Sequence, residues 1–224
     1  MDIIDKLKFE ERNAVAEGLA MMTYIPSIGR ALESGGVDKF IRIMSEEIKQ
    51  LENIISQEEF DSFHDSIVKL IKKEIKAKDG KTLSHGQAQK PLNVFLKVYV
   101  DWASLPSLDK SCQIRKFLHV PLDSILMREI KNNFPDDYKR YVEANYALIR
   151  ESHRKSRFYE EFGESGLLIL IRPSDFSLSK LIFKEMYYAW QHCLRAIYPE
   201  KPVLLDVLWS TRRKYKEPKK KSEN

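Results

Sequence analysis

Cysteine is scarce in this sequence. Its 224 residues include only Cys112 and Cys193, which lie far apart and match no metal-binding or redox spacing. We therefore expect neither a disulfide framework nor a cysteine-based metal site. The same scarcity favours a reducing, cytoplasmic compartment.

Long apolar runs are absent as well. No segment reaches the length of a membrane span, and Asp2 and Asp5 precede the first basic residue with no apolar stretch behind them. We therefore expect no membrane association and no signal peptide. The sequence also shows no repeat period, glycine-rich phosphate loop, zinc-protease motif or Ser-His-Asp signature.

Strand-like segments are nearly missing. The composition, with 43% hydrophobic and 32% charged residues, is that of a helix-rich globular protein. Only Leu167–Ile171 has the pattern of a buried strand, and a buried helical turn fits it equally well. We predict an all-α fold with one compact domain over residues 1–211, or two helical lobes (1–79 and 80–211) that flank a cleft. A basic tail follows at 212–224.

Capping signals mark one helix clearly. Ser56, followed three residues later by Glu59, predicts the start of a helix that runs through Ile75. A long amphipathic helix is predicted before it, over residues 37–55. His64 is expected at the surface or the boundary of the later helix.

Lys90 is a candidate reactive amine. A very apolar helix is predicted to start near it, because Pro91 suits a first helical position. Only Asn93, Lys97 and Asp101 form a polar stripe on this helix. The helix dipole and an apolar neighbourhood both disfavour the ammonium and favour the nucleophilic amine. The alternative is a solvated lysine without a catalytic role.

Asp123 is the candidate carboxylate that accompanies this amine. It follows Pro121 and precedes a helix that is predicted to run to about Lys131. Either Asp123 or Ser124 is suited to cap that helix by accepting a backbone N–H. Capping alone is therefore the alternative to catalysis.

Three short segments of the chain share a pattern with known motifs. They are Lys90 with Phe95 and Lys97, Val120–Asp123 (V-P-L-D), and Pro202–Trp209 (P-V-L-L-D-V-L-W). In the same order, they resemble the K-x-x-x-F-x-x-K, I-P-x-D and P-x-x-L-D-x-x-L-W motifs of archaeal 8-oxoguanine DNA glycosylases, a branch of the helix-hairpin-helix superfamily. The first has one residue more before the aromatic, and the last is one residue shorter. The superfamily's two-glycine hairpin turn is absent, and only Gly86 marks the bend.

The resemblance implies a glycosylase/AP lyase that flips an oxidised purine out of double-stranded DNA. Lys90 would attack the sugar C1′ and form a Schiff base, and Asp123 would orient or deprotonate the amine and stabilise the sugar cation. No cofactor or metal is then needed. The candidate substrate-binding residues are Phe95, Trp102, Asp206 and Trp209.

The charge is compatible with a nucleic-acid partner. The net charge is +5 and the isoelectric point is about 9.0. A basic run that continues a predicted helix supplies Arg150, Arg154 and Arg157, which together with Lys97 are candidate phosphate contacts. The alternative is a solvated helix face.

Two other functions compete with the glycosylase. A non-catalytic helical protein that binds nucleic acid or a protein partner needs Lys90 and Asp123 only for packing and capping. A hydrolase that attacks phosphate ranks last, because acids and histidines at metal-binding spacing are missing. If the protein is the enzyme, the Lys90 amine and the Asp123 carboxylate should share one sugar-sized cavity.

Overall fold

The protein is mostly helical in the part that the computed structural model describes, residues 3–154 and 156–208. Within these ranges, β-pairing is limited to two isolated bridges, so the predicted all-α class is confirmed. The strand-like run is helical up to Leu170. Its predicted alternative of a helical turn is the correct one.

The α-helices, in chain order, are α1 (Ile3–Ser27), α2 (Gly36–Glu47), α3 (Gln57–Glu74), α4 (His85–Leu96), α5 (Leu108–Ile114), α6 (Ser124–Asn133), α7 (Pro135–Asp137), α8 (Ala144–His153), α9 (Arg157–Leu170) and α10 (Lys184–Ile197). The shorter turns are the 3-10 segments η1 (Gly29–Ala31), η2 (Ile48–Asn53), η4 (Arg115–Phe117), η6 (Leu178–Lys180) and η7 (Pro202–Val207), with two wider π turns, η3 (Lys97–Trp102) and η5 (Tyr138–Glu143). The helix predicted over 37–55 is therefore α2 followed by the tighter η2.

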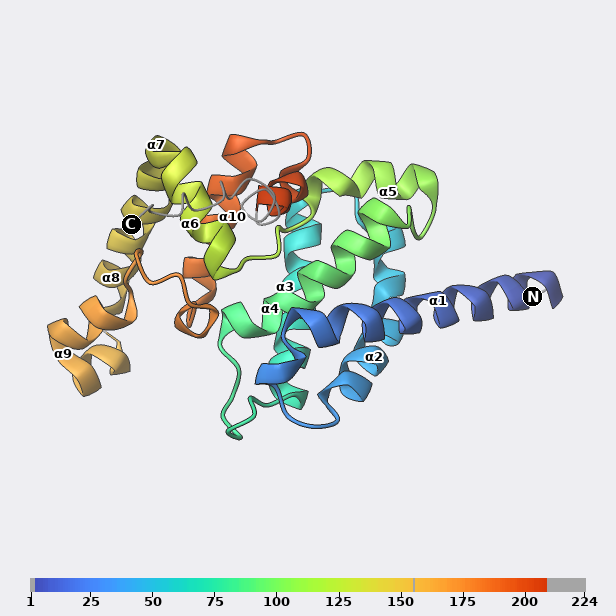
Figure 1. Ribbon diagram of the computed structural model, residues 1–224, viewed down its shortest axis with the longest axis horizontal. Helices are drawn as coiled ribbons and strands as arrows, with labels where there is room; N and C mark the ends of the chain where they lie inside the picture. The colour runs from blue at the N-terminus through green and yellow to red at the C-terminus, as the bar shows by residue number, and fades with distance from the viewer. Residues whose placement is uncertain (1–2, 155, 209–224) are drawn as a thin grey trace, which may run out of the picture.

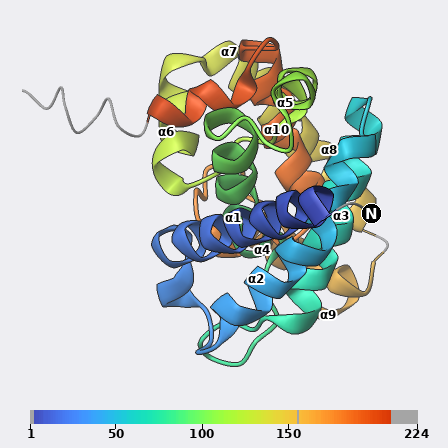
Figure 2. The ribbon, with the colours of Figure 1, turned by 90° about the vertical axis from the view of Figure 1, so that its right-hand side faces the viewer.

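The helices form two halves, each with its own apolar core. Helices α1 to α5 make one half and α6 to α10 the other, as Figure 1 shows, and Figure 2 views the first half with α1 in front. One buried cluster extends from Ala16 to Leu118 and includes Val203, and the second begins at Val120. The division therefore lies near residue 119 instead of between residues 79 and 80, because the apolar face of α4 is buried against the N-terminal helices.

A buried polar network lies where the two cores meet. His64 Nε2 is 2.7 Å from Asn93 Oδ1, and Asn93 Nδ2 donates to Tyr187 Oη at 2.9 Å. The Gln191 side-chain amide binds both the N–H and the carbonyl of Val120, each at 2.9 Å. This network joins α3, α4, α10 and the segment that leads into α6.

The position of His64 differs from the prediction. It is 0% exposed, because it lies one helical turn from Phe60 and faces the core with it and with Ile67. The predicted capping box of Ser56 and Glu59 is confirmed at the start of the same helix. In the described ranges, no helix combines the length and apolarity that crossing a membrane requires.

Candidate functional site

Lys90 lies in the second turn of α4. The helix begins at His85, because Ser84 Oγ accepts the Gln87 N–H at 3.1 Å while Gln87 Oε1 accepts the Ser84 N–H at 3.0 Å. The predicted helix start near Lys90 is therefore wrong, and Pro91 lies inside the helix. The amine is consequently away from the first turn, where the helix dipole acts.

Asp123 caps α6, as predicted, and also faces Lys90. Its Oδ1 accepts the N–H groups of Ile125 at 2.9 Å and Leu126 at 2.8 Å. Its Oδ2 lies 3.4 Å from Lys90 Nζ. Because the two backbone N–H groups hold Oδ1, the carboxylate is fixed in place and its Oδ2 is directed at the Lys90 amine. The side chains are 16% (Lys90) and 25% (Asp123) exposed, so the pair is partly removed from water.

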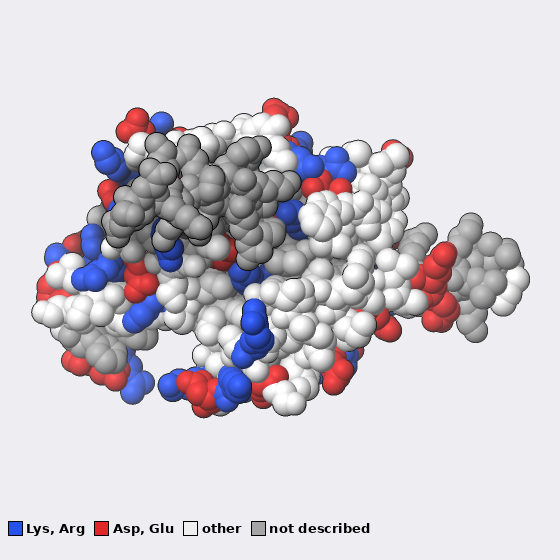
Figure 3. Space-filling view, viewed as in Figure 1, with Lys and Arg blue, Asp and Glu red and all other residues white. Residues whose placement is uncertain are grey.

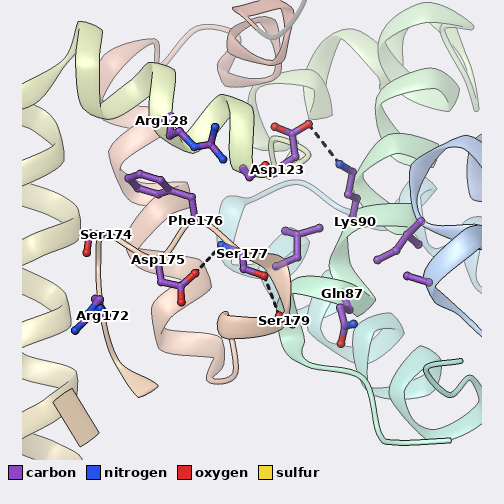
Figure 4. A pocket seen from close by; sticks show the side chains of 14 residues that line it. Gln87, Lys90, Asp123, Arg128, Arg172, Ser174, Asp175, Phe176, Ser177 and Ser179 are labelled. Carbon is purple, nitrogen blue, oxygen red and sulfur yellow. Dashed lines mark hydrogen bonds and ion pairs between the residues drawn. The ribbon is translucent and has the colours of Figure 1, made fainter. Parts of the chain in front are cut away.

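Two cavities of different character meet at this pair. The first, which we call the polar groove, has a volume of about 790 Å³ and lies between α4, α6 and the segment 172–179 (Figure 4). The second, which we call the apolar pocket, has a volume of about 540 Å³ and lies between the end of α1, α4 with η3, and η7. Lys90 and Asp123 line both cavities.

The apolar pocket contains a second lysine–aspartate pair. Its apolar walls are Pro26, Val94, Val98, Trp102, Pro121, Ile125 and Val207. Lys97 Nζ lies 2.6 Å from Asp206 Oδ2, and the two side chains are only 8% and 12% exposed. Burial raises the pKa of the Asp206 carboxyl above its usual range, while the neighbouring Lys97 charge opposes that rise. Lys97 is therefore not the predicted phosphate contact, because a buried carboxylate already neutralises it.

The aromatic candidates have different positions. Trp102 lines the apolar pocket and is 67% exposed, with Lys97 Nζ 5.1 Å from its ring centroid. Phe95 is 0% exposed and packs against Phe40 and Tyr99 in the core, so its predicted contact with substrate is wrong. The prediction for Trp209 lies outside the described residues.

The predicted arginine contacts are not at this site. Arg154 is paired with Glu151 at 2.7 Å and Glu164 at 3.0 Å, so its charge is compensated locally. Arg150 donates to the carbonyl of Ile171 at 3.4 Å, and Arg157 is exposed at the start of α9. None of the three arginines lines the polar groove or the apolar pocket.

The polar groove contains residues that sequence reasoning missed. They are Arg128, Arg172, Ser174, Ser177 and Ser179, and Ser124, which was considered only as a cap, lines the groove as well. A signal was present, since Arg128 lies one helical turn after Ser124 and so faces the same side of α6. The serine spacing after Pro173 gave no comparable signal, because it has no helical or strand period.

In the described residues, no group of three or more histidine, cysteine or acidic side chains is arranged to hold a metal ion. The site itself offers an amine, a carboxylate and the walls of two cavities. Comparison of the chain with protein-family models, with curated proteins and with solved structures found no match.

Proposed function

We propose that this protein is a DNA base-excision enzyme of the glycosylase/AP lyase type, which acts on an oxidised purine through a Schiff base on Lys90. The observation that carries the proposal is the 3.4 Å approach of Lys90 Nζ to Asp123 Oδ2 at the junction of two unlike cavities. A nucleotide has a planar base and a charged sugar-phosphate, so it matches an apolar pocket and a polar groove that meet at one reactive centre.

The apolar pocket suits the base. Val94, Val98 and the exposed Trp102 offer apolar and aromatic surface, and the Lys97–Asp206 pair offers polar contacts at the edge of a ring. Because a base in a duplex is stacked, it has to be flipped out to enter this pocket.

The Lys90–Asp123 pair would then carry the chemistry. The amine nitrogen bonds to C1′ as the bond from C1′ to the base breaks, and the base leaves with the electron pair and a proton. Asp123 Oδ2 accepts the proton that the amine loses on bonding to C1′, passes it to the departing base, and stabilises the positive charge on the sugar. Opening of the sugar ring gives the Schiff base, from which loss of a C2′ proton expels the 3′ phosphate and cleaves the strand.

Borohydride trapping tests this directly. The protein is mixed with duplexes that carry 8-oxoguanine or an abasic site and is then reduced, so that a Schiff base becomes a stable adduct. We expect an adduct that disappears with Lys90→Ala and persists with Lys116→Ala, an exposed lysine outside both cavities. Asp123→Asn should slow trapping by about 10²-fold or more, while the asparagine still caps α6.

Two results would contradict the proposal, the first for the role of Lys90 and the second for the enzyme as a whole. An adduct that survives Lys90→Ala would place the amine elsewhere. The absence of any adduct, with salt-dependent DNA binding retained, would indicate a non-catalytic nucleic-acid-binding protein in which Asp123 only caps α6 and pairs with Lys90.

A further inference from the structure

We infer that the polar groove is a phosphate-binding track in which Arg128 and Arg172 hold the DNA strand beside the nucleotide that reacts. The inference extends the proposed function and rests on it for the identity of the strand. It assigns a binding role to α6 and to the segment 172–179, neither of which supplies the reacting amine.

The charges of the groove favour an anion. Lys90 and Asp123 compensate each other, and Asp175 Oδ1 is used within its own loop, where it accepts the Ser177 N–H at 3.2 Å. Within the described residues, the guanidinium groups of Arg128 and Arg172 have no ion-pair or hydrogen-bond partner. Two arginines without an ion-pair partner, against the single unpaired carboxylate of Asp175, leave the groove with a net positive charge that matches phosphate, which arginine binds through a planar set of donors.

The hydroxyl groups add donors of the type that contacts a DNA backbone. Ser124 and Ser174 have no side-chain hydrogen bond among the described residues, and Ser177 Oγ and Ser179 Oγ lie 2.8 Å apart. Figure 4 shows the Arg128 side chain beside Phe176, on the side of the groove where Asp123 lies. Serine hydroxyls and arginines together are the usual contacts to phosphate and sugar oxygens.

The loop is held in place before any ligand binds. Ser84 Oγ donates to the Leu178 carbonyl at 2.8 Å, and the Gly86 N–H donates to the Leu181 carbonyl at 3.0 Å. A Cβ at Gly86 would lie only 2.4 Å from the Leu178 oxygen, so glycine permits this close approach. At the other end, Tyr138 Oη donates to the Pro173 carbonyl at 2.9 Å. A fixed polar loop binds an anion without first losing conformational freedom.

The charge of the groove is positive on balance. Figure 3 shows Lys and Arg side chains together with Asp and Glu side chains along the lower edge of this face. The groove itself has three basic residues, Lys90, Arg128 and Arg172, against two acidic ones, Asp123 and Asp175.

The salt dependence of DNA binding tests the inference. The probe is a duplex with a tetrahydrofuran abasic analogue, which cannot form a Schiff base. We expect the slope of log Kd against log salt to fall by about 0.9 for each phosphate that is no longer neutralised, hence by about two in the Arg128→Ala/Arg172→Ala protein. Replacement of both by lysine should restore most of the slope, because the charge returns. Arg154→Ala is the control and should leave the slope unchanged.

The outcomes distinguish a failure of the groove proposal from a failure of the catalytic proposal. A slope unchanged in the double alanine protein, with a normal melting temperature, would overturn the groove even if Lys90-dependent trapping occurs. A wild-type protein that does not bind the duplex would also overturn it. A reduced slope in the double variant, with no trapping by the wild type, would support the groove and reject the glycosylase chemistry.

Discussion

At the scale of single residues, Lys97 and Asp206 each need the other to compensate a buried charge. The two side chains come from η3 and η7, and together they form a charged floor in a pocket with apolar walls. A buried ion pair is not strongly stabilising by itself, but one ion left alone is costly. A substitution that removes only one of the two charges should therefore destabilise the fold, and by more when the remaining group stays charged.

Asp206→Asn should lower the free energy of unfolding by about 3–5 kcal/mol, because it leaves the Lys97 ammonium buried without a counter-charge. Lys97→Met should cost less, since the raised pKa of Asp206 makes its neutral form accessible. Urea denaturation measures both. Lys39→Met, which removes an ion pair with Glu33 and a hydrogen bond to the Glu74 carbonyl from a lysine that is 42% exposed, is the control and should change stability less than either substitution. An Asp206→Asn protein as stable as the wild type would contradict the prediction.

Among the elements, α4 is the one that determines the site. Its capping box sets where Lys90 lies along the helix, and the same Ser84 hydroxyl binds the Leu178 carbonyl of the groove loop. Helix α3 has an identical type of cap at Ser56, for which no contact to a distant segment occurs in the described residues. The two caps therefore form a matched pair for experiment.

Ser56→Ala should lower the free energy of unfolding by about 1 kcal/mol, the usual value of an N-cap. Ser84→Ala should lower it by about 1 kcal/mol more, because a second hydrogen bond is removed and the Leu178 carbonyl is left without this partner. Thermal or urea denaturation of the two variants side by side measures the difference. Equal losses of stability would mean that Ser84 does not contribute to holding the groove loop on α4.

For the whole molecule, the polar junction between the two cores makes stability depend on pH. Burial lowers the pKa of His64 to about 4 and of His85 to about 3, and it lowers the pKa of His119 well below its usual range. Burial would raise the pKa of Asp61, but the His119 hydrogen bond and the Arg195 charge hold it below its usual value. The histidines are therefore neutral in the folded protein, packed between α3, α4 and α10.

We expect stability to be highest above about pH 6.5 and to fall as the pH decreases from there towards 4. In that range, the unfolded chain takes up protons on these histidines that the folded protein cannot, so acid favours unfolding. At pH 5, one such histidine lowers the free energy of unfolding by roughly 2 kcal/mol. Urea denaturation at pH 7.5 and 5.0 measures the loss, and His85→Asn should reduce it by about that amount. Equal stability at the two pH values would show that the histidines do not stay neutral in the fold.

Much of the local structure was predictable, because it depends on neighbours in the chain. The all-α class follows from apolar side chains at helical spacing, and the caps at Ser56 and Asp123 follow from oxygen-bearing side chains just before such a pattern. The start of α4 was predicted wrongly. Pro91 suits a first helical position, and the reciprocal cap of Ser84 and Gln87 also indicates a helix start. The sequence pattern alone does not decide between these two signals.

The sequence by itself determined the all-α class, the caps at Ser56 and Asp123 and the candidate pair Lys90 and Asp123, because these depend on residue type and short-range spacing. Only the tertiary structure decided that the pair lies at the junction of two cavities, and that Asp206 neutralises Lys97. It also decided that Phe95 and His64 are buried and that Arg128 and Arg172 share a groove. These features depend on contacts between helices far apart in the chain, and the distances across such contacts are set by the packing of the two cores.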